Sequence, residues 1–148
     1  MDRSARNKDR RINIKMKTFK QFLAESTYTL YRSGDLSAPN KMLFFSPDRS
    51  IADSYANGRK IGEYQVRINN PLIINATNDV SAILQITKKL QGKDVETYDL
   101  DGDKWQKLDK RNAEILKKSP YDAIFIKQDG KIKEVQIAKD QFHGIKVN

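Results

Sequence analysis

Six side chains, spread over four short segments of the sequence, could do chemistry together. They are Tyr31, Arg32, Phe45, Ser46, Tyr55 and Glu134. A guanidinium is a planar, permanently charged donor that suits phosphate oxygens. A carboxylate suits a reaction in which positive charge develops on a ribose carbon, as happens when a glycosidic bond breaks. Arg32 and Glu134 therefore favour the binding of a nucleotide and its cleavage at the ribose.

Other members of this set fit supporting roles in the same site. The hydroxyl of Ser46 can hydrogen-bond Glu134 and hold it in place. The rings of Phe45 and Tyr55 can stack on a flat heterocycle. Because Phe44 and Phe45 are adjacent in a predicted strand, one ring must point into the core and the other away from it.

Each residue alone also fits an ordinary structural role. Arg32 could be an ion-paired surface residue at a strand end. Ser46 could cap the helix that is predicted to start after Pro47. Glu134 has lysines nearby in the sequence and could simply neutralise them. The joint occurrence, rather than any single member, favours an enzymatic site.

The hydropathy pattern predicts the elements that must position these side chains. Alternating apolar residues indicate strands, and apolar residues spaced three and four apart indicate helices. Strands are predicted over residues 28–32, 42–46, 61–68, 72–75, 122–127, 132–138 and 142–147, and helices over residues 48–56, 79–90 and 104–118. Residues 93–103 are predicted to form a polar loop. Strands dominate and no internal repeat is present, which predicts an α+β fold.

The composition bounds the class of protein. A length of 148 residues fits one domain, and the lack of cysteine excludes a disulfide scaffold, a thiol nucleophile and a cysteine-based metal site. No cluster of carboxylates and histidine indicates a metal. No apolar run approaches the roughly 18 to 20 residues that span a bilayer, and no secretory signal is recognisable. We therefore expect an intracellular type of protein without a metal or a membrane partner.

The N-terminal segment differs from the rest of the chain. Residues 1–25 hold eight basic and three acidic residues, a charge of +5, out of a net charge of +9. The remaining 123 residues carry only +4, which argues against a DNA-coating role. Residues 1–15 are expected to be disordered. Met16 is an alternative start of translation, which would make them an upstream extension.

The order of the chemical segments resembles that of the ADP-ribosyltransferase superfamily, specifically its Arg-Ser-Glu branch and the short relatives encoded by phages and mobile elements. The likeness also includes the strand break INNPL at residues 68–72, the string YDAI at residues 121–124 and EVQI at residues 134–137. It implies two packed, mainly antiparallel sheets with two or three helices over residues 26–148. It also implies that NAD is the substrate and that no metal takes part.

The resemblance assigns a role to each of the six side chains. It implies that Tyr31 and Arg32 bind NAD and that Ser46 and Glu134 act at the reacting ribose. It also implies that Phe45 and Tyr55 pack against the nicotinamide. One position departs from the family pattern: Ile132 stands where relatives that modify protein arginine carry Glu or Gln. The acceptor is therefore left open as a host protein or nucleic acid. His143 is expected to be structural or exposed, which argues against the His-Tyr-Glu branch.

Residues 16–25, MKTFKQFLAE, resemble the capsid-targeting sequence of internal head proteins of T-even-type bacteriophages. This resemblance implies that a prohead protease cuts between Glu25 and Ser26. Residues 26–148 would then be packaged in the virion, inside the phage head, and delivered with the DNA into the host cytoplasm. The alternative is an ordinary amphipathic helix that docks on a partner surface.

The expected function is therefore that of a monomeric, phage-delivered mono-ADP-ribosyltransferase, which transfers ADP-ribose from NAD to a host component. Two alternatives remain open at this point. One is a non-enzymatic injected inhibitor of a host defence protein. The other is an inactive transferase fold that is used for binding.

Overall fold

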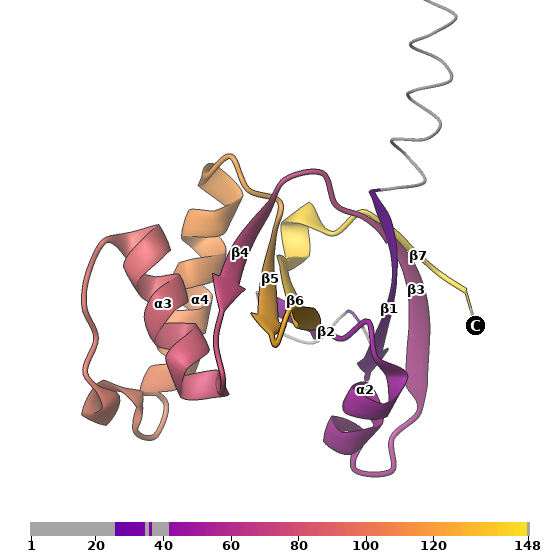
Figure 1. The fold of residues 1–148 in the computed structure, drawn as a ribbon, viewed down its shortest axis with the longest axis horizontal. Coiled ribbons are helices and arrows are strands. Elements are labelled where there is room, and N and C mark those ends of the chain that lie inside the picture. The colour runs from indigo at the N-terminus through magenta and orange to yellow at the C-terminus, as the bar shows by residue number, and fades with distance from the viewer. Residues whose placement is uncertain (1–25, 35, 37–41, 148) are drawn as a thin grey trace, which may run out of the picture.

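A computed structural model describes residues 26–34, 36 and 42–147 of the chain. These residues form one sheet of three strands, one of four strands and three α-helices (Figure 1). The α+β fold of two mainly antiparallel sheets that the sequence predicts is thus confirmed. The basic segment, the helical stripe of residues 16–25 and Glu25 all lie outside the described residues.

The three-stranded sheet has the order β1-β3-β7 and is antiparallel throughout. Its strands are β1 (Thr27–Ser33), β3 (Ile61–Arg67) and β7 (Gly144–Lys146). Alternation along β1 and β3 sends Leu30, Tyr64 and Val66 into the core between the two sheets. Ser26, the residue after the expected cut, already belongs to this unit because its carbonyl accepts from the Ile68 amide at 2.8 Å.

The four-stranded sheet has the order β2-β6-β5-β4. Its strands are β2 (Met42–Phe45), β6 (Lys131–Ala138), β5 (Ala123–Gln128) and β4 (Pro71–Asn75). The β4–β5 pair is parallel, whereas the other two pairs are antiparallel. A parallel pair needs a long crossover, which the helices between β4 and β5 supply. The turn between β5 and β6 has left-handed residues at Asp129 and Gly130, as tight hairpins require.

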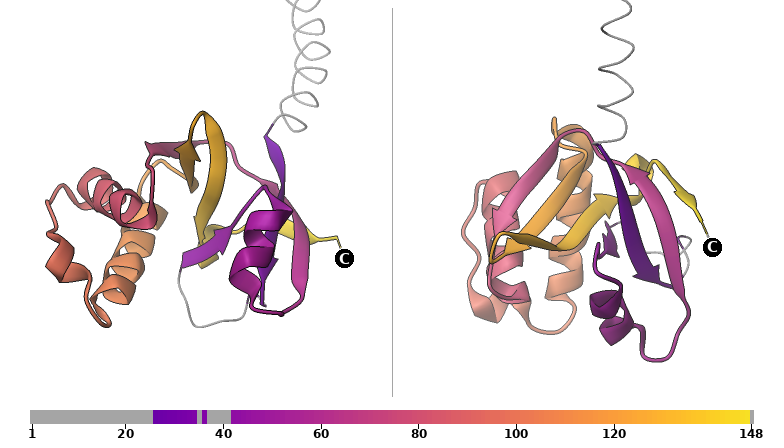
Figure 2. Two further views of the ribbon diagram at one scale, coloured as in Figure 1. Left: turned by 60° about the horizontal axis from the view of Figure 1, so that its bottom comes forward. Right: turned by 45° about the vertical axis from the view of Figure 1, so that its right-hand side comes forward.

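The four-stranded sheet lies between the helices and the three-stranded sheet (Figures 1 and 2). Helices α3 (Asp79–Gln91) and α4 (Lys104–Lys118) cover one face, where Ile86 and Leu116 join the core. The short helix α2 (Arg49–Ala56) instead packs against β1 and β3 through Ala52 and Ala56. Among the described residues, no helix has the length and apolar character needed to cross a membrane.

Two local predictions were wrong. Asp48, not Ser46, caps α2, because the Asp48 carboxylate accepts from the Ser50 amide at 2.9 Å. The stretch predicted as a polar loop contains a short 3₁₀ helix, Thr97–Leu100, and a second one, Lys139–Gln141, separates β6 from β7. The last strand, Gly144–Lys146, is also shorter than the predicted range of residues 142–147.

The short connection from β3 to β4, which leads from one sheet to the other, is held in place by one carboxylate. Asp122 accepts from the backbone amides of Asn69 and Asn70 at 2.7 and 2.9 Å, just after β3. The Asp122 amide in turn donates to the Asn70 carbonyl at 3.1 Å. These bonds hold the start of β4 beside the start of β5, so they set the register in which Pro71 pairs with Ala123.

Replacing Asp122 with Ala should destabilise the fold, because the variant loses two hydrogen bonds to a charged acceptor. We expect a loss of about 1 to 3 kcal/mol in the free energy of unfolding, measured by urea denaturation. Asp94→Ala is the matched control, since Asp94 makes only an exposed ion pair with Lys88. Equal stability losses in the two variants would contradict this assignment.

Candidate functional site

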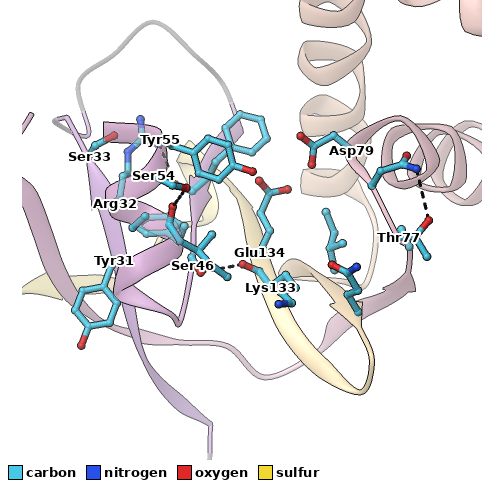
Figure 3. A pocket seen from close by; sticks show the side chains of 18 of the residues that line it. Tyr31, Arg32, Ser33, Ser46, Ser54, Tyr55, Thr77, Asp79, Lys133 and Glu134 are labelled. Carbon is cyan, nitrogen blue, oxygen red and sulfur yellow. Dashed lines mark hydrogen bonds between the residues drawn. The ribbon is translucent and has the colours of Figure 1, made fainter. Parts of the chain in front are cut away.

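A cavity of about 670 Å³ opens between the ends of the two sheets, α2 and the start of α3 (Figure 3). Its volume lies in the range of about 300 to 1,000 Å³ that is common for ligand sites. All six residues singled out from the sequence border it: Tyr31, Arg32, Phe45, Ser46, Tyr55 and Glu134. The fold therefore brings together residues that are more than a hundred positions apart in the chain. The side chain of Tyr31, however, points away from the cavity in Figure 3 and packs against the small core between α2 and β3, so the expected contact of its ring with NAD needs a correction.

The backbones of β1 and β2 meet at the wall of this cavity. Tyr31 and Ser46 exchange two hydrogen bonds, from the Tyr31 amide at 2.8 Å and from the Ser46 amide at 2.9 Å. This isolated bridge joins a strand of one sheet to the end of a strand of the other. It places Arg32 next to the residues that follow β2.

Arg32 lies on the inward face of β1, two residues after Leu30. Its Nη1 atom donates to the Phe44 carbonyl at 3.1 Å, and its guanidinium carbon lies 5.9 Å from the centre of the Phe45 ring. These contacts fix the side chain at the cavity wall.

Ser46 connects three parts of the structure with one hydroxyl. The side chain is only 4% exposed, donates to the Lys133 carbonyl at 2.9 Å and accepts from the Asp48 amide at 3.1 Å. The sequence predicted a hydrogen bond from the Ser46 hydroxyl to the Glu134 carboxylate. The structure differs, because the single hydroxyl hydrogen of Ser46 is directed to the Lys133 carbonyl. Ser46 instead positions the backbone of β6 one residue before Glu134.

Glu134 lies on the face of β6 that points away from the three-stranded sheet, while Val135 points into the core between the sheets. Its Oε2 atom accepts from Gln136 Nε2 at 2.9 Å. Burial raises the pKa of Glu134, the nearby charge of Asp79 raises it further, and the bond from Gln136 partly offsets both effects. The carboxyl group is thus half-buried and held at a defined position.

The prediction for Phe45 needs a correction. Its ring is 3% exposed, stacks on Phe142 with centroids 5.5 Å apart and meets Tyr64 edge to face. Although Phe45 borders the cavity, the core occupies its ring, because strand alternation turns it between the sheets. Its neighbour Phe44 has the partly exposed ring on the Glu134 side.

Tyr55 occupies the open side of the cavity. The side chain is 60% exposed and its hydroxyl points toward Glu134 in Figure 3. The charge of Asp79 raises the pKa of Tyr55, with smaller contributions from burial and from Glu134. Tyr55 therefore faces both carboxylates across the cavity and stays a neutral donor at physiological pH.

Sequence reasoning missed three charged residues that line the same cavity: Arg59, Asp79 and Lys133. Arg59 follows the Asn57-Gly58 turn, and its Nε atom donates to the Ala56 carbonyl at 3.0 Å. Asp79 is the first residue of α3, where an acidic side chain is common because it interacts favourably with the helix dipole, so nothing in the sequence indicated a role in the cavity. The cavity consequently has a guanidinium side formed by Arg32 and Arg59 and a carboxylate side formed by Asp79 and Glu134, where Lys133 adds one cation beside Glu134 in β6.

Two further expectations concern residues near the site. Ile132 packs against the core between the sheets, so its aliphatic character has a structural reason. His143 is exposed and accepts a bond from the Arg67 amide through its backbone carbonyl. Within the described part of the chain, no group of three or more His, Asp or Glu side chains could hold a metal ion.

Comparisons of the chain with protein-family models, with curated proteins and with solved structures found no match. A pocket with guanidinium groups at one side and a half-buried carboxylate at the other suits a ligand that carries phosphates and a centre of developing positive charge.

Replacing Ser46 with Ala should loosen the connection between β2, α2 and β6. The Lys133 carbonyl and the Asp48 amide lose their partner, so we expect a stability loss of about 1 to 3 kcal/mol and faster hydrogen exchange of the Asp48 amide. Ser54→Ala is the control, because the Ser54 hydroxyl bonds only to Ile51 within α2. Unchanged exchange at Asp48 would show that Ser46 does not hold this connection.

Proposed function

We propose that the cavity binds NAD and that the protein is a mono-ADP-ribosyltransferase of the Arg-Ser-Glu type. The observation that carries the proposal is that Arg32, Ser46 and Glu134, from three separate strand segments, line one cavity of about 670 Å³. Unrelated surface residues have no reason to converge in this way. The opposite charges at its two sides also match the two ends of the reacting half of NAD.

The pyrophosphate of NAD fits the side of the cavity that Arg32 and Arg59 line. Both guanidinium groups are anchored by backbone carbonyls, at 3.1 and 3.0 Å, which limits the entropy that each loses when a ligand binds. Arginine suits this role better than lysine because its fork can donate to two phosphate oxygens at once. The nicotinamide riboside then extends toward Glu134.

In the proposed reaction the bond between ribose C1′ and the nicotinamide nitrogen breaks, and both electrons leave with nicotinamide. The Glu134 carboxylate stabilises the positive charge that develops on the ribose. A nucleophilic atom of the acceptor then bonds to C1′ and releases its proton to solvent. Tyr55 and the partly exposed ring of Phe44 are the aromatic groups available to cover the nicotinamide.

The acceptor is proposed to be a host protein or nucleic acid of a type that does not need a carboxamide or carboxylate at position 132. Ile132 is packed against the core and offers no polar atom to an acceptor. Any acceptor recognition must therefore come from other residues around the cavity mouth, such as Asp79 and Tyr55.

We also propose that the protein is an internal head protein of a phage, delivered with the DNA. The support is the resemblance of residues 16–25 to a capsid-targeting sequence. The strand β1 begins two residues after Glu25, so a cut at Glu25 leaves every strand of the two described sheets intact. A domain without cysteine can also unfold and refold in transit without a redox partner.

Replacing Glu134 with Gln should lower the rate of NAD cleavage by about 10² to 10³, because the charge that stabilises the ribose cation is lost. The affinity for NAD should change little, since Arg32 and Arg59 remain. The measurement is nicotinamide release from NAD by the full chain in the presence of a host lysate, with NAD affinity measured by calorimetry.

Glu96→Gln is the matched control, because Glu96 lies outside the cavity. Equal rates in the Glu134 variant and in the wild-type protein would contradict the catalytic assignment. Intact NAD with every variant, together with binding to a host protein, would favour the non-enzymatic inhibitor instead.

Co-expression with a T-even-type prohead protease should yield a fragment that begins at Ser26. Intact-mass spectrometry detects the cut, and Glu25→Gln should prevent it because the recognised triplet ends in a carboxylate. The fragment is expected to melt within a few degrees of the full chain, since both sheets remain. An uncut chain, or a cut elsewhere, would contradict the proposed capsid targeting.

A further inference from the structure

A second, smaller cavity of about 110 Å³ lies behind Glu134. It shares Phe44, Asp79 and Glu134 with the larger cavity, so Glu134 stands in the wall between the two. Its other polar lining residues are Asp109, Gln136 and Trp105. None of the six residues predicted from the sequence except Glu134 reaches it.

Gln136 is an unusual residue to find at this place in β6. The side chain is 6% exposed and donates to Glu134 at 2.9 Å, while its Oε1 atom is buried without a hydrogen-bond partner among the described residues. An unsatisfied buried carbonyl costs about 1 to 3 kcal/mol, which a methionine of similar size would avoid. The hydrogen bond that Gln136 donates to Glu134 offsets this unfavourable burial and gives a reason for a glutamine at this position.

Asp109 faces Glu134 from α4 across the smaller cavity. Burial raises the pKa of Asp109 to about 7, the charge of Glu134 adds to the rise, and a hydrogen bond from Trp105 opposes it. Asp109 and Glu134 share this poorly hydrated space, which Asp79 also lines, and the two buried carboxyl groups cannot both ionise easily. Between the pH at which Glu134 ionises and about pH 7, the pair therefore holds one proton, and that proton lies on Asp109.

We propose that Gln136 and Asp109 are positioning residues for Glu134: Gln136 fixes the orientation of its carboxylate, and Asp109 holds the proton that leaves Glu134 ionised. The catalytic consequence rests on the proposed function, whereas the coupling between the two carboxyl groups does not. The smaller cavity is then part of the catalytic apparatus, although no ligand needs to enter it.

The other charged groups near the pair come from several elements. Tyr55 on α2 faces Glu134 from the larger cavity, whereas Asp79 on α3 lines both cavities. The cations Arg32, Arg59 and Lys133 also line that larger cavity, while no lysine or arginine of the described chain lines the smaller one. The smaller cavity therefore offers Asp109 no lysine or arginine that would stabilise its ionised form.

Carboxyl carbon NMR of the full chain, labelled at Asp and Glu, tests the coupling without any turnover. We expect the Glu134 signal to show its own inflection and a second one near pH 7, when Asp109 ionises. In Asp109→Asn the second inflection should disappear while the first stays in place, because asparagine mimics the protonated acid. Gln136→Met should move the first inflection to higher pH, since the bond that favours the carboxylate is lost.

A single inflection for Glu134 in the wild-type protein, or an identical second inflection in Asp109→Asn, would overturn the coupling. An unmoved first inflection in Gln136→Met would overturn the role of Gln136. Turnover gives a separate test: Gln136→Met should lower kcat about tenfold or more with KM unchanged. If neither the wild-type protein nor any variant cleaves NAD but the titrations behave as expected, the proposed function is wrong and the coupling between Asp109 and Glu134 still holds.

Discussion

The arrangement of the site depends on the hydrogen bonds that converge at Ser46. Its backbone pairs with Tyr31 of the three-stranded sheet, and its buried hydroxyl bonds to Lys133 of the four-stranded sheet. The same hydroxyl accepts from the Asp48 amide and so fixes where α2 begins. One small side chain thereby joins both sheets and a helix at the wall of the cavity. Its burial makes each of these bonds expensive to lose, because water cannot replace the missing partner.

Strand alternation distributes the chemistry once the sheets are joined at this point. Along β6, Val135 faces the core between the sheets, whereas Glu134 and Gln136 face the helices. The helices then close a poorly hydrated space around the carboxylate, and burial raises its pKa. A separation of opposite charges follows, with guanidinium groups on the β1 and α2 side and carboxyl groups on the β6, α3 and α4 side.

The apolar periods of strands and helices were sufficient to predict most elements and the α+β class. The six residues that share the cavity came instead from the chemistry of their side chains and from the resemblance to the ADP-ribosyltransferase superfamily. It could not decide which of Phe44 and Phe45 is free, since adjacent strand residues differ only in the face that tertiary packing selects. The sequence placed Ser46 at the cavity but did not predict its hydrogen-bond partner, because Ser46 and Lys133 are far apart in the chain. Asp109 and Gln136 were missed, since a polar helix and a polar strand position carry no distinctive spacing.

The central claim is that the cavity between the two sheets is the NAD site. A crystal structure of the full chain with NAD, or with a non-hydrolysable analogue, tests this claim most directly. The account predicts that the pyrophosphate contacts the guanidinium of Arg32 and that the nicotinamide ribose lies against the carboxylate of Glu134. A dinucleotide bound elsewhere on the surface, or an empty cavity at a saturating concentration of NAD, would contradict it.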